Sequence, residues 1–538
     1  MDNKTIARHF SLLADLMELH HENPFKIKSY DFAGRHLKNI NAPLAELSIE
    51  ELENIEGVGK AIAAKIFHLT HIGKLDLLEK YLDITPAGVV DLLQLKGIGP
   101  KKIAQLWKEL EIESIGELEY ACNENRLITL KGFGTKTQNN ILEQINFIKQ
   151  SSHKFLWSNL EALANEVLAD IQSQYLDILI STCGDYRRKA IVLEKIDFLV
   201  ATENTEIQHL ILEKYQQFPT SFSFCKREDF YLKLLALSSD EEHYGFLSFK
   251  INTDKIYTSE NEIYQDAGLP FIVPELRDSK IEFKLIEQNN LDNLVELNDI
   301  KGVVHAHSKY SDGANSLKEL ATYCKEQGFE YLVISDHSKS AFYADGMKED
   351  KILEQHAEID KLNEQLFPFK IFKSVESDIL YDGNLDYDDE IMKSFDLIIA
   401  SVHSQLKMNE ERSMLRLIKA IENPYTTILG HLTGRLLLSR QGYPVNHKKI
   451  IDACAANNVC IELNANPYRL DIDYSWIDYC QEKNVKISIN PDAHNLRGVH
   501  DIKYGVQAAR KGGLLKQNTL NILTKNNFEQ YILDKNKR

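Results

Sequence analysis

From residue 300 onward, this chain of 538 residues repeats one arrangement, in which an apolar segment of strand length is followed by histidine or a carboxylate. The apolar segments span 303–304, 331–334, 397–400, 459–463 and 485–489, and stretches of helical periodicity separate them. Such alternation predicts parallel βα units that close into a barrel. Functional residues of βα barrels gather at the carboxyl ends of the strands, which is where these polar residues fall.

Nine potential metal donors follow the apolar segments: His305, His307, Asp312, His337, Glu376, His403, His431, Asp492 and His494. Taken singly, each histidine would more often be a hydrogen-bonded core or surface residue, but six of them with three carboxylates at successive strand ends form a set. His305 and His307 are alternate residues, so a strand end would present both on one side. Imidazole and carboxylate donors without thiolate suit Zn²⁺, Mn²⁺ or Fe²⁺. Because nine donors exceed the needs of one ion, we expect two or three divalent metals.

The composition excludes several classes of protein. With 43% hydrophobic and 27% charged residues, the chain is neither disordered nor fibrous. No apolar run reaches the ~18 residues of a membrane-spanning helix, and the N-terminal stretch lacks the apolar core of a signal peptide. The seven cysteines form no C-x-x-C pair, which argues against a disulfide framework or a thiolate zinc site. We expect a cytoplasmic monomer with no membrane contact.

Residues 1 to about 150 predict a helical region, because apolar residues recur at spacings of three and four from Ile6 to Met17 through Phe10 and Leu13. Three turns in this region share the pattern apolar, polar, Gly, apolar, Gly: Ile55-Glu-Gly-Val-Gly-Lys60, Leu95-Lys-Gly-Ile-Gly-Pro100 and Leu130-Lys-Gly-Phe-Gly-Thr135. The first glycine permits a positive φ, and the second permits close approach of another backbone. The exposed N–H groups of the helix that follows attract an anion.

These turns resemble the helix-hairpin-helix motif, which grips nucleic-acid backbone without reading its sequence. The alternative is that they are ordinary helix–helix turns. The occurrence of three copies of one pattern argues against it. The net charge of −17 argues against generic polyanion binding, but lysines beside the turns supply local positive charge. The predicted DNA contacts are Gly57, Gly59, Lys60, Gly97, Gly99, Lys101, Lys102, Gly132, Gly134 and Lys136.

Further segments are similar to bacterial family X DNA polymerases: Asn23-Pro-Phe-Lys-Ile-Lys-Ser-Tyr30, Gly184-Asp-Tyr-Arg-Arg188, Ile196-Asp197-Phe-Leu, and Gly268-Leu-Pro through Pro274-Glu-Leu-Arg277. In that family the palm carries Gly-Ser-x-Arg-Arg, then Gly-Asp-x-Asp, and a third Asp on a later strand. Those carboxylates hold two divalent metals for nucleotidyl transfer. Strand-like segments at 176–180 and 196–200 mark the palm in this chain.

The palm motif departs from the family pattern at its metal-binding carboxylates. Lys195 stands at the first catalytic Asp, Ser221 aligns near the third, and Asp197 alone matches; Asp185 replaces the Ser and Glu194 the Gly. A lysine removes a ligand and repels Mg²⁺, so the resemblance implies a degenerate palm that keeps a scaffold or DNA-binding role without Mg²⁺.

Three basic residues of this region have two interpretations each. Arg187 and Arg188 either contact phosphate or are solvated or salt-bridged. Lys65 matches the Schiff-base lysine that removes deoxyribose phosphate in polymerase beta, with an ordinary helix-surface lysine as the alternative.

The C-terminal motifs resemble the PHP domain (polymerase and histidinol phosphatase), a distorted (βα)₇ barrel with a trinuclear metal site, and all nine ligand positions carry the expected residue type. The resemblance implies that His305, His307, Glu376 and Asp492 hold one metal. Glu376 would bridge to a second metal that is also bound by His403 and His431, and Asp312, His337 and His494 would hold the third. It also implies catalysis by metal-bound water, with Arg435 and Arg469 gripping phosphate oxygens or forming structural salt bridges.

The expected architecture is multidomain α and α/β. A helix-hairpin-helix region spans 1–150, a polymerase-beta-like α+β palm and thumb spans 151–290, and a PHP barrel spans 296–538. The expected function is DNA repair by a nucleoid-associated, metal-dependent 3′-5′ exonuclease or phosphoesterase. It would act without sequence preference on gapped, nicked or 3′-ended DNA, and the resemblance adds abasic-site cleavage and 3′-phosphate removal. Three alternatives stay open: an active gap-filling polymerase with 3′-5′ exonuclease, a histidinol-phosphatase-like small-molecule phosphatase, and a non-catalytic DNA-binding scaffold.

Overall fold

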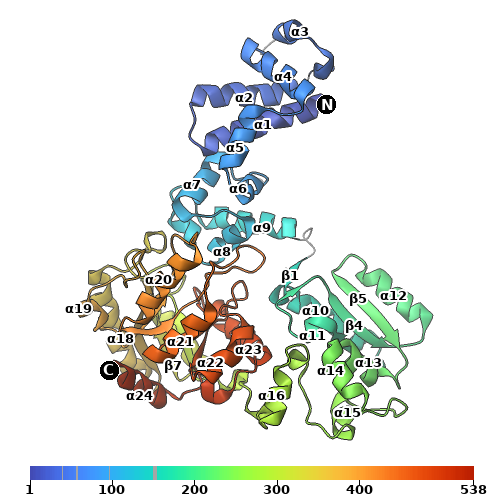
Figure 1. The fold of residues 1–538 in the computed structure, drawn as a ribbon, viewed down its shortest axis with the longest axis vertical. Helices are drawn as coiled ribbons and strands as arrows, with labels where there is room; N and C mark the ends of the chain where they lie inside the picture. The colour runs from blue at the N-terminus through green and yellow to red at the C-terminus, as the bar shows by residue number, and fades with distance from the viewer. Residues whose placement is uncertain (39, 41, 56–57, 96, 150–153, 538) are drawn as a thin grey trace. The chain divides into compact units, whose positions relative to one another are not determined.

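The computed structural model describes residues 1–538 except 39, 41, 56–57, 96, 150–153 and 538. The chain forms two compact units (Figure 1). The first contains Met1–Asn123 and Leu130–Ile148, and the second contains Glu124–Thr129 and Lys149–Arg538. No helix among the described residues is long and apolar enough to cross a lipid bilayer.

The described part of the first unit is helical, as the sequence predicts. Its helices are α1 (Asn3–Leu19), α2 (Pro24–Leu37), α3 (Ile49–Glu53), α4 (Lys60–Ile72), α5 (Asp76–Ile84), α6 (Ala87–Leu92), α7 (Pro100–Leu110), α8 (Ile115–Asn123) and α9 (Thr135–Lys149). Helix α1 begins at an N-cap, where the Asp2 side chain accepts a hydrogen bond from the amide of Thr5. Its predicted apolar face, Ile6, Phe10, Leu13 and Met17, is fully buried.

Each glycine turn leads directly into a helix. Gly59 and Gly99 are the N-caps of α4 and α7, and α9 begins one residue after Gly134. The first glycines of the second and third turns have positive φ, +86° at Gly97 and +89° at Gly132. The corresponding Gly57 lies outside the described residues.

The middle of the chain, within the second unit, contains a mixed three-stranded sheet. Strand β4 (Ile196–Ala201) pairs antiparallel with β2 (Ile180–Cys183) and parallel with β5 (Thr220–Cys225). Strands β1 (Phe155–Leu156) and β3 (Val192–Leu193) form a separate short antiparallel pair. The helices of this part of the chain are α10 (Trp157–Gln174), α11 (Gly184–Arg187), α12 (Thr205–Tyr215), α13 (Phe230–Leu237), α14 (Glu241–Ser248), α15 (Glu260–Asp266) and α16 (Ile281–Glu287). The predicted strand at 196–200 is present.

The strand predicted at 176–180 is wrong in its position, because β2 begins only at Ile180. Residues 176–177 form a turn after α10, and the Leu176 side chain is 89% exposed. The apolar run misled the prediction because its first member faces solvent rather than the sheet.

The C-terminal part of the second unit is a seven-stranded parallel sheet that nearly closes into a barrel. The strands are β6 (Gly302–Ala306), β7 (Tyr331–Ile334), β8 (Lys370–Asp378), β9 (Leu397–Ser401), β10 (Thr426–Leu429), β11 (Cys460–Asn464) and β12 (Ile487–Asn490), in sequential order. A bridge between Ala306 and Ala493 joins the first strand to the segment after the last. The predicted (βα)₇ barrel is therefore confirmed.

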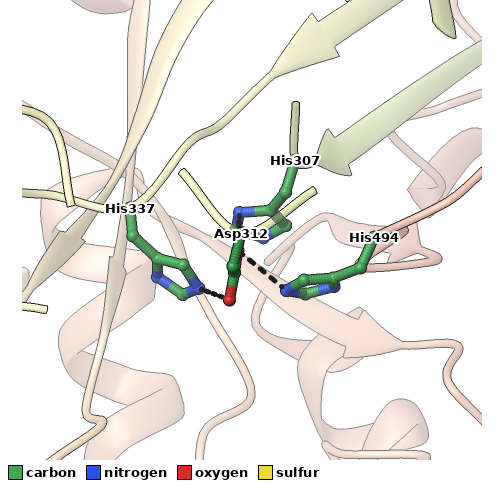
Figure 2. A group of neighbouring side chains, drawn as sticks. All are labelled: His307, Asp312, His337 and His494. Carbon is green, nitrogen blue, oxygen red and sulfur yellow. Dashed lines mark ion pairs between the residues drawn. The ribbon is translucent and has the colours of Figure 1, made fainter. Parts of the chain in front are cut away.

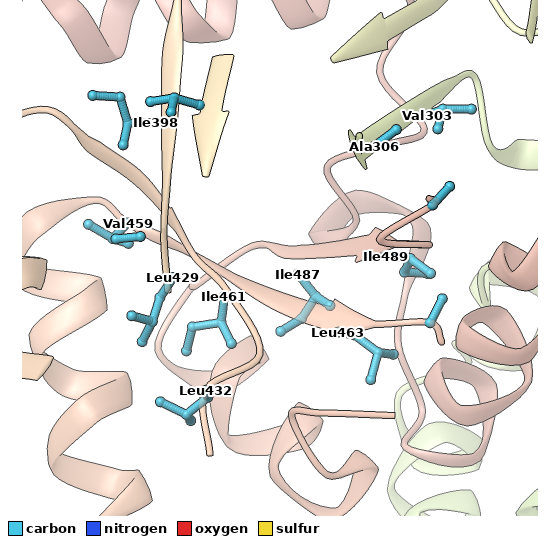
Figure 3. Close-up of a cluster of buried hydrophobic side chains, with 14 of the residues drawn as sticks. Val303, Ala306, Ile398, Leu429, Leu432, Val459, Ile461, Leu463, Ile487 and Ile489 are labelled. Atoms are coloured by element: carbon cyan, nitrogen blue, oxygen red, sulfur yellow. The ribbon is translucent and has the colours of Figure 1, made fainter. Parts of the chain in front are cut away.

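The barrel strands are buried on both faces, as expected for a parallel sheet. One face packs against the helices that follow the strands: α17 (Leu317–Glu326), α18 (Glu349–Leu366), α19 (Asp389–Met392), α20 (Glu410–Ile421), α21 (His447–Asn457), α22 (Ile477–Glu482) and α23 (Ile502–Lys511). Figure 3 shows part of this core, including Val303, Ile461 and Ile487. Alternate residues such as Val304 and Ile399 pack with Phe528 of α24 (Lys525–Asn536). The carboxyl ends of the strands carry the polar residues.

Candidate metal centre

The end of β6 carries the first two histidines of the centre, and a bulge aims them. The pairing register of β6 with β7 shifts between Val304 and Ala306, and His305 has φ +67°. A bulge re-aims side chains at the rim of a barrel, so both rings reach the same carboxylate. The Nε2 atoms of His305 and His307 lie 3.4 and 3.0 Å from Oδ1 of Asp492.

A second group forms around Asp312, in the loop after β6 (Figure 2). Nε2 of His337 lies 3.5 Å from one carboxylate oxygen, and Nε2 of His494 lies 3.4 Å from the other. His307 completes this group of four potential donors. The structure thus brings together Asp312, His337 and His494, the residues predicted for the third metal.

Glu376, near the end of β8, lies at the middle of the centre. Its Oε1 is 3.1 Å from Nε2 of His403 and 2.9 Å from Nε2 of His431. The same oxygen is 3.3 Å from Nε2 of His305. One carboxylate oxygen thus faces the imidazoles of three predicted ligands.

The residues present fit a cluster of divalent metals. The side chains of all nine are at most 4% exposed. Several of their donor atoms are buried without a hydrogen-bond partner among the described residues: Nε2 of His305, Nδ1 of His307, both ring nitrogens of His337, Nε2 of His494, Oδ2 of Asp312 and Oε2 of Glu376. Buried polar atoms are normally hydrogen-bonded, so donor atoms that instead face one another at ion-pair distance fit the ligands of a metal ion. Nitrogen and carboxylate donors in this number suit a multinuclear site.

Carboxylates and imidazoles of the centre shift one another's pKa values, and the histidines shift in different directions. Burial opposes protonation of His337, but Asp312 and Glu376 outweigh it and raise its pKa to about 10. Burial, together with His494 and His337, lowers the pKa of His307 to about 3, which leaves its ring neutral as a metal ligand must be. Burial opposes ionisation of Glu376, but His403 and His305 outweigh it and hold the pKa of this carboxyl well below its usual range. Asp492 is held ionised in the same way, by His305 and His307.

Three carboxylates that the sequence analysis did not single out hydrogen-bond the predicted ligands or the loop that carries one of them. Nδ1 of His305 lies 2.6 Å from Oε2 of Glu462, and Nδ1 of His403 hydrogen-bonds Asp378. Asp336 accepts hydrogen bonds from the hydroxyls of Ser308 and Ser311 and so holds the loop that carries Asp312. Such partners orient metal ligands. In the sequence, Glu462 could have been found as a charged residue within an apolar strand segment. Asp336 and Asp378 lie one and two positions from the predicted ligands His337 and Glu376.

The two predicted arginines have different surroundings. Arg435 is tied to the loop at 469–473, since Nη1 lies 2.7 Å from Asp473 and Nε donates to the backbone oxygen of Arg469. Arg469 is buried, and its Nε is 4.0 Å from Oδ2 of the predicted ligand Asp492. Of the two, Arg469 is the cation that lies beside the metal donors.

The described residues among the predicted DNA contacts belong to the first unit. Lys60, Lys101 and Lys136 are exposed, and Nζ of Lys102 stands 5.0 Å from the ring centre of Phe133, so the second and third turns are neighbours. Lys65 lies on α4, where its Nζ is 3.4 Å from the backbone oxygen of Ala61 and 5.9 Å from the ring centre of Tyr30.

In the predicted palm, Asp197 lies beside the two residues that the sequence alignment places at the other carboxylate positions. Nζ of Lys195 is 3.3 Å from its Oδ1, and Ser221, opposite it in the β4–β5 register, donates a hydrogen bond to it. The two palm arginines form ion pairs, Arg187 with Glu260 and Arg188 with Asp185 and Asp278.

The barrel and its donor set define a metal-dependent phosphoesterase domain of the PHP class, on a chain that also carries helix-hairpin-helix turns. Family models agree: a helix-hairpin-helix domain matches residues 1–75, a SAM-like helix-hairpin-helix tandem matches 89–146, and the PHP domain matches 304–466. Asp492 and His494 lie beyond the matched PHP segment.

The chain is 33% identical to the DNA polymerase/3′-5′ exonuclease PolX of Bacillus subtilis (strain 168), over 99% of both chains. The chain belongs to this PolX family. It is also 26% identical to probable phosphatases of Thermoanaerobacter sp. (strain X514) and Acetivibrio thermocellus, over 40% and 35% of this chain and 88% and 78% of theirs.

Proposed function

We propose that this chain hydrolyses phosphodiester bonds of DNA at its metal centre and removes nucleotides from a 3′ end. The nine-donor centre carries the proposal, and the PolX relative, which is named as a 3′-5′ exonuclease, supports it. Divalent metals held there would polarise phosphoryl oxygens and lower the pKa of water.

The side chains of this centre have separable roles in the proposed reaction. The nine predicted ligands would hold the metals, with Glu376 within reach of His305, His403 and His431. Glu462 and Asp378 fix the rings of His305 and His403. Arg469, whose guanidinium lies beside Asp492, is suited to bind a phosphate oxygen of the substrate.

We propose that the glycine turns of 1–150 hold the DNA backbone for the PHP domain of 296–538. Gly99 and Gly134 are suitable test positions, because a Cβ built at either meets no atom within 4 Å. Substituting both by Val should leave the fold intact and weaken DNA binding about tenfold or more, because the side chains obstruct the approach of the phosphate backbone. Fluorescence anisotropy with gapped DNA measures the affinity. Gly245→Val, at another position where a Cβ meets no atom within 4 Å, is the matched control, and unchanged affinity of the double variant would exclude the hairpin assignment.

We further propose that the palm of 151–290 no longer synthesises DNA. Asp197 is engaged by Lys195 and Ser221, so an ammonium and a hydroxyl stand where the family has its first and third carboxylates. An ammonium about 4 Å from Mg²⁺ opposes binding by ~2 kcal/mol even in bulk water, and by more near a protein.

Gap-filling synthesis alongside the exonuclease is the second candidate function. The PolX relative favours it, since its name includes both activities and it aligns over nearly the whole chain. The two candidates make the same prediction for the metal centre and opposite predictions for the palm.

A primer assay separates the two candidates. The protein is incubated with Mn²⁺ and a 5′-labelled primer on a gapped template, with and without the four deoxynucleotides. We expect shortening in both lanes and no extension. The assay is repeated with His305→Ala/His307→Ala, in which the exonuclease no longer degrades the products. Extension by either protein would show that the palm is active despite Lys195.

A phosphatase acting on small molecules is favoured by the probable phosphatases that match the barrel. The glycine turns have no use in such a reaction. Turnover of a small phosphomonoester that matches or exceeds turnover of DNA would support this candidate over the exonuclease.

A further inference from the structure

Residues Glu124–Thr129 belong to the second unit, although the chain on both sides of them belongs to the first. They connect α8 to the third glycine turn and include the short helix η2 (Arg126–Thr129). The helix-hairpin-helix tandem model spans them. A connector within the DNA-binding region therefore packs with the unit that contains the metal centre.

This connector places a carboxylate in direct contact with a predicted metal ligand. Glu124 is only 4% exposed, and its Oε2 pairs with Nδ1 of His494. Its Oε1 lies 3.4 Å from Nδ2 of Asn466, in the loop after β11. Arg126 stacks on the ring of Tyr343, with Cζ 4.9 Å from the ring centre, and Tyr343 neighbours His337 and His403.

The two nitrogens of His494 face different groups. Nε2 points to Asp312 and is buried without a hydrogen-bond partner among the described residues (Figure 2). Nδ1 is on the other side of the ring, where it contacts Glu124 and the backbone oxygen of Asp492 at 3.0 Å. Nε2 is therefore the nitrogen that can bind a metal, while the contacts of Nδ1 can fix the orientation of the ring.

His305 and His403 also have a carboxylate at Nδ1 while Nε2 faces the centre, through a hydrogen bond in each case, whereas His494 and Glu124 form an ion pair. Their carboxylates, Glu462 and Asp378, come from strands of the barrel. For His494 the corresponding carboxylate comes from the connector.

We propose that Glu124 is a positioning residue of the metal centre, which holds the ring of His494 through Nδ1 and thereby makes metal binding depend on the docking of the connector. This inference rests on the proposed function only in taking the nine-donor centre as the site of hydrolysis. By linkage, metal binding stabilises the docked connector by the same factor as docking strengthens metal binding.

The test compares full-length variants after metal removal and titration with Mn²⁺, and measures metal content and affinity. Loss of such a partner weakens metal binding about 10–100-fold. We expect this loss in Glu124→Gln and Glu124→Ala, partial rescue in Glu124→Asp, and a comparable loss in Asp378→Asn. Glu143→Gln, at an exposed position of α9, should bind metal as the unmodified protein does. Metal saturation should restore kcat of the Gln variant while KM for DNA stays unchanged.

Two outcomes would overturn the proposal. Unchanged metal affinity in both the Gln and Ala variants would show that Glu124 does not act on the centre. Loss of one whole metal equivalent in the Gln variant would make Glu124 a ligand instead.

Hydrogen exchange gives a readout that depends on neither a variant's folding nor DNA hydrolysis. Amides of 124–128 should be better protected in the metal-loaded protein than in the stripped one, and equal protection would contradict the linkage. Because the metal and exchange measurements need no substrate, a protein that binds metal as described but cleaves no DNA would refute the proposed function and leave this inference intact.

Discussion

Substituting His305 and His307 by Ala should lower DNA hydrolysis by about 10³-fold or more, equivalent to ~4 kcal/mol in the activation barrier. Both rings face Asp492, and His305 also faces the shared Glu376. The double variant therefore loses two donors at the most crowded point of the centre. Digestion of 5′-labelled DNA with Mn²⁺ measures the loss.

DNA binding should be unchanged in this variant, because the glycine turns are distant in sequence and belong to the other compact unit. His500→Ala, at an exposed position of the same domain, is the matched control and should retain activity within about twofold. The double variant also leaves Glu462 buried without its partner, which costs stability. The single variant His431→Ala, whose Nδ1 has no hydrogen-bond partner among the described residues, covers that case, with circular dichroism as a check of folding. Retained hydrolysis in folded variants would exclude the metal assignment.

Removing metal by chelation should lower the unfolding temperature of the barrel by several degrees and abolish hydrolysis. The centre gathers Asp312, Glu376 and Asp492 in a buried space with several unpartnered donor atoms. Metal that binds only the folded state stabilises it, by about 4 kcal/mol when free metal is 1,000 times the dissociation constant.

Calorimetry of stripped, reloaded and untreated protein measures this effect. Reloading with Mn²⁺ or Zn²⁺ should restore both the unfolding temperature and the activity, and the ion that restores both identifies the working metal. His305→Ala/His307→Ala should show a smaller shift. Identical unfolding of stripped and reloaded protein would mean that these donors do not bind metal.

Much of the metal centre was predictable because its residues are local to strands. An apolar strand of a parallel sheet ends at a shared rim, so a polar residue two or three positions beyond it must lie at that rim, as His403 and His431 do after β9 and β10. The same reasoning applied to the helical region, where the glycine pattern predicted the positive φ of Gly97 and Gly132 and the helix starts after Gly99 and Gly134.

The predictions were weaker where a side chain's direction depends on its surroundings. Leu176 suggested a strand by its type, but it lies exposed in a turn. Alternation correctly placed His305 and His307 on one side, yet it is the bulge and the φ of +67° at His305 that aim both rings at Asp492. Whether an arginine binds substrate or its own loop was open in the sequence, and the contacts of Arg435 with Asp473 and its neighbours appear only in the fold.

The sequence by itself determined the helical N-terminal region and the C-terminal barrel, and predicted which strand-end residues gather at its rim, because periodicity, glycine turns and strand ends are short-range patterns. Only the tertiary structure decided which carboxylates stand behind the ligands. Glu124 and His494 are 370 positions apart (494 minus 124), and no local pattern connects them. Their contact exists because a connector of the helical region is buried against the barrel, where a carboxylate removed from water requires a hydrogen-bonding partner.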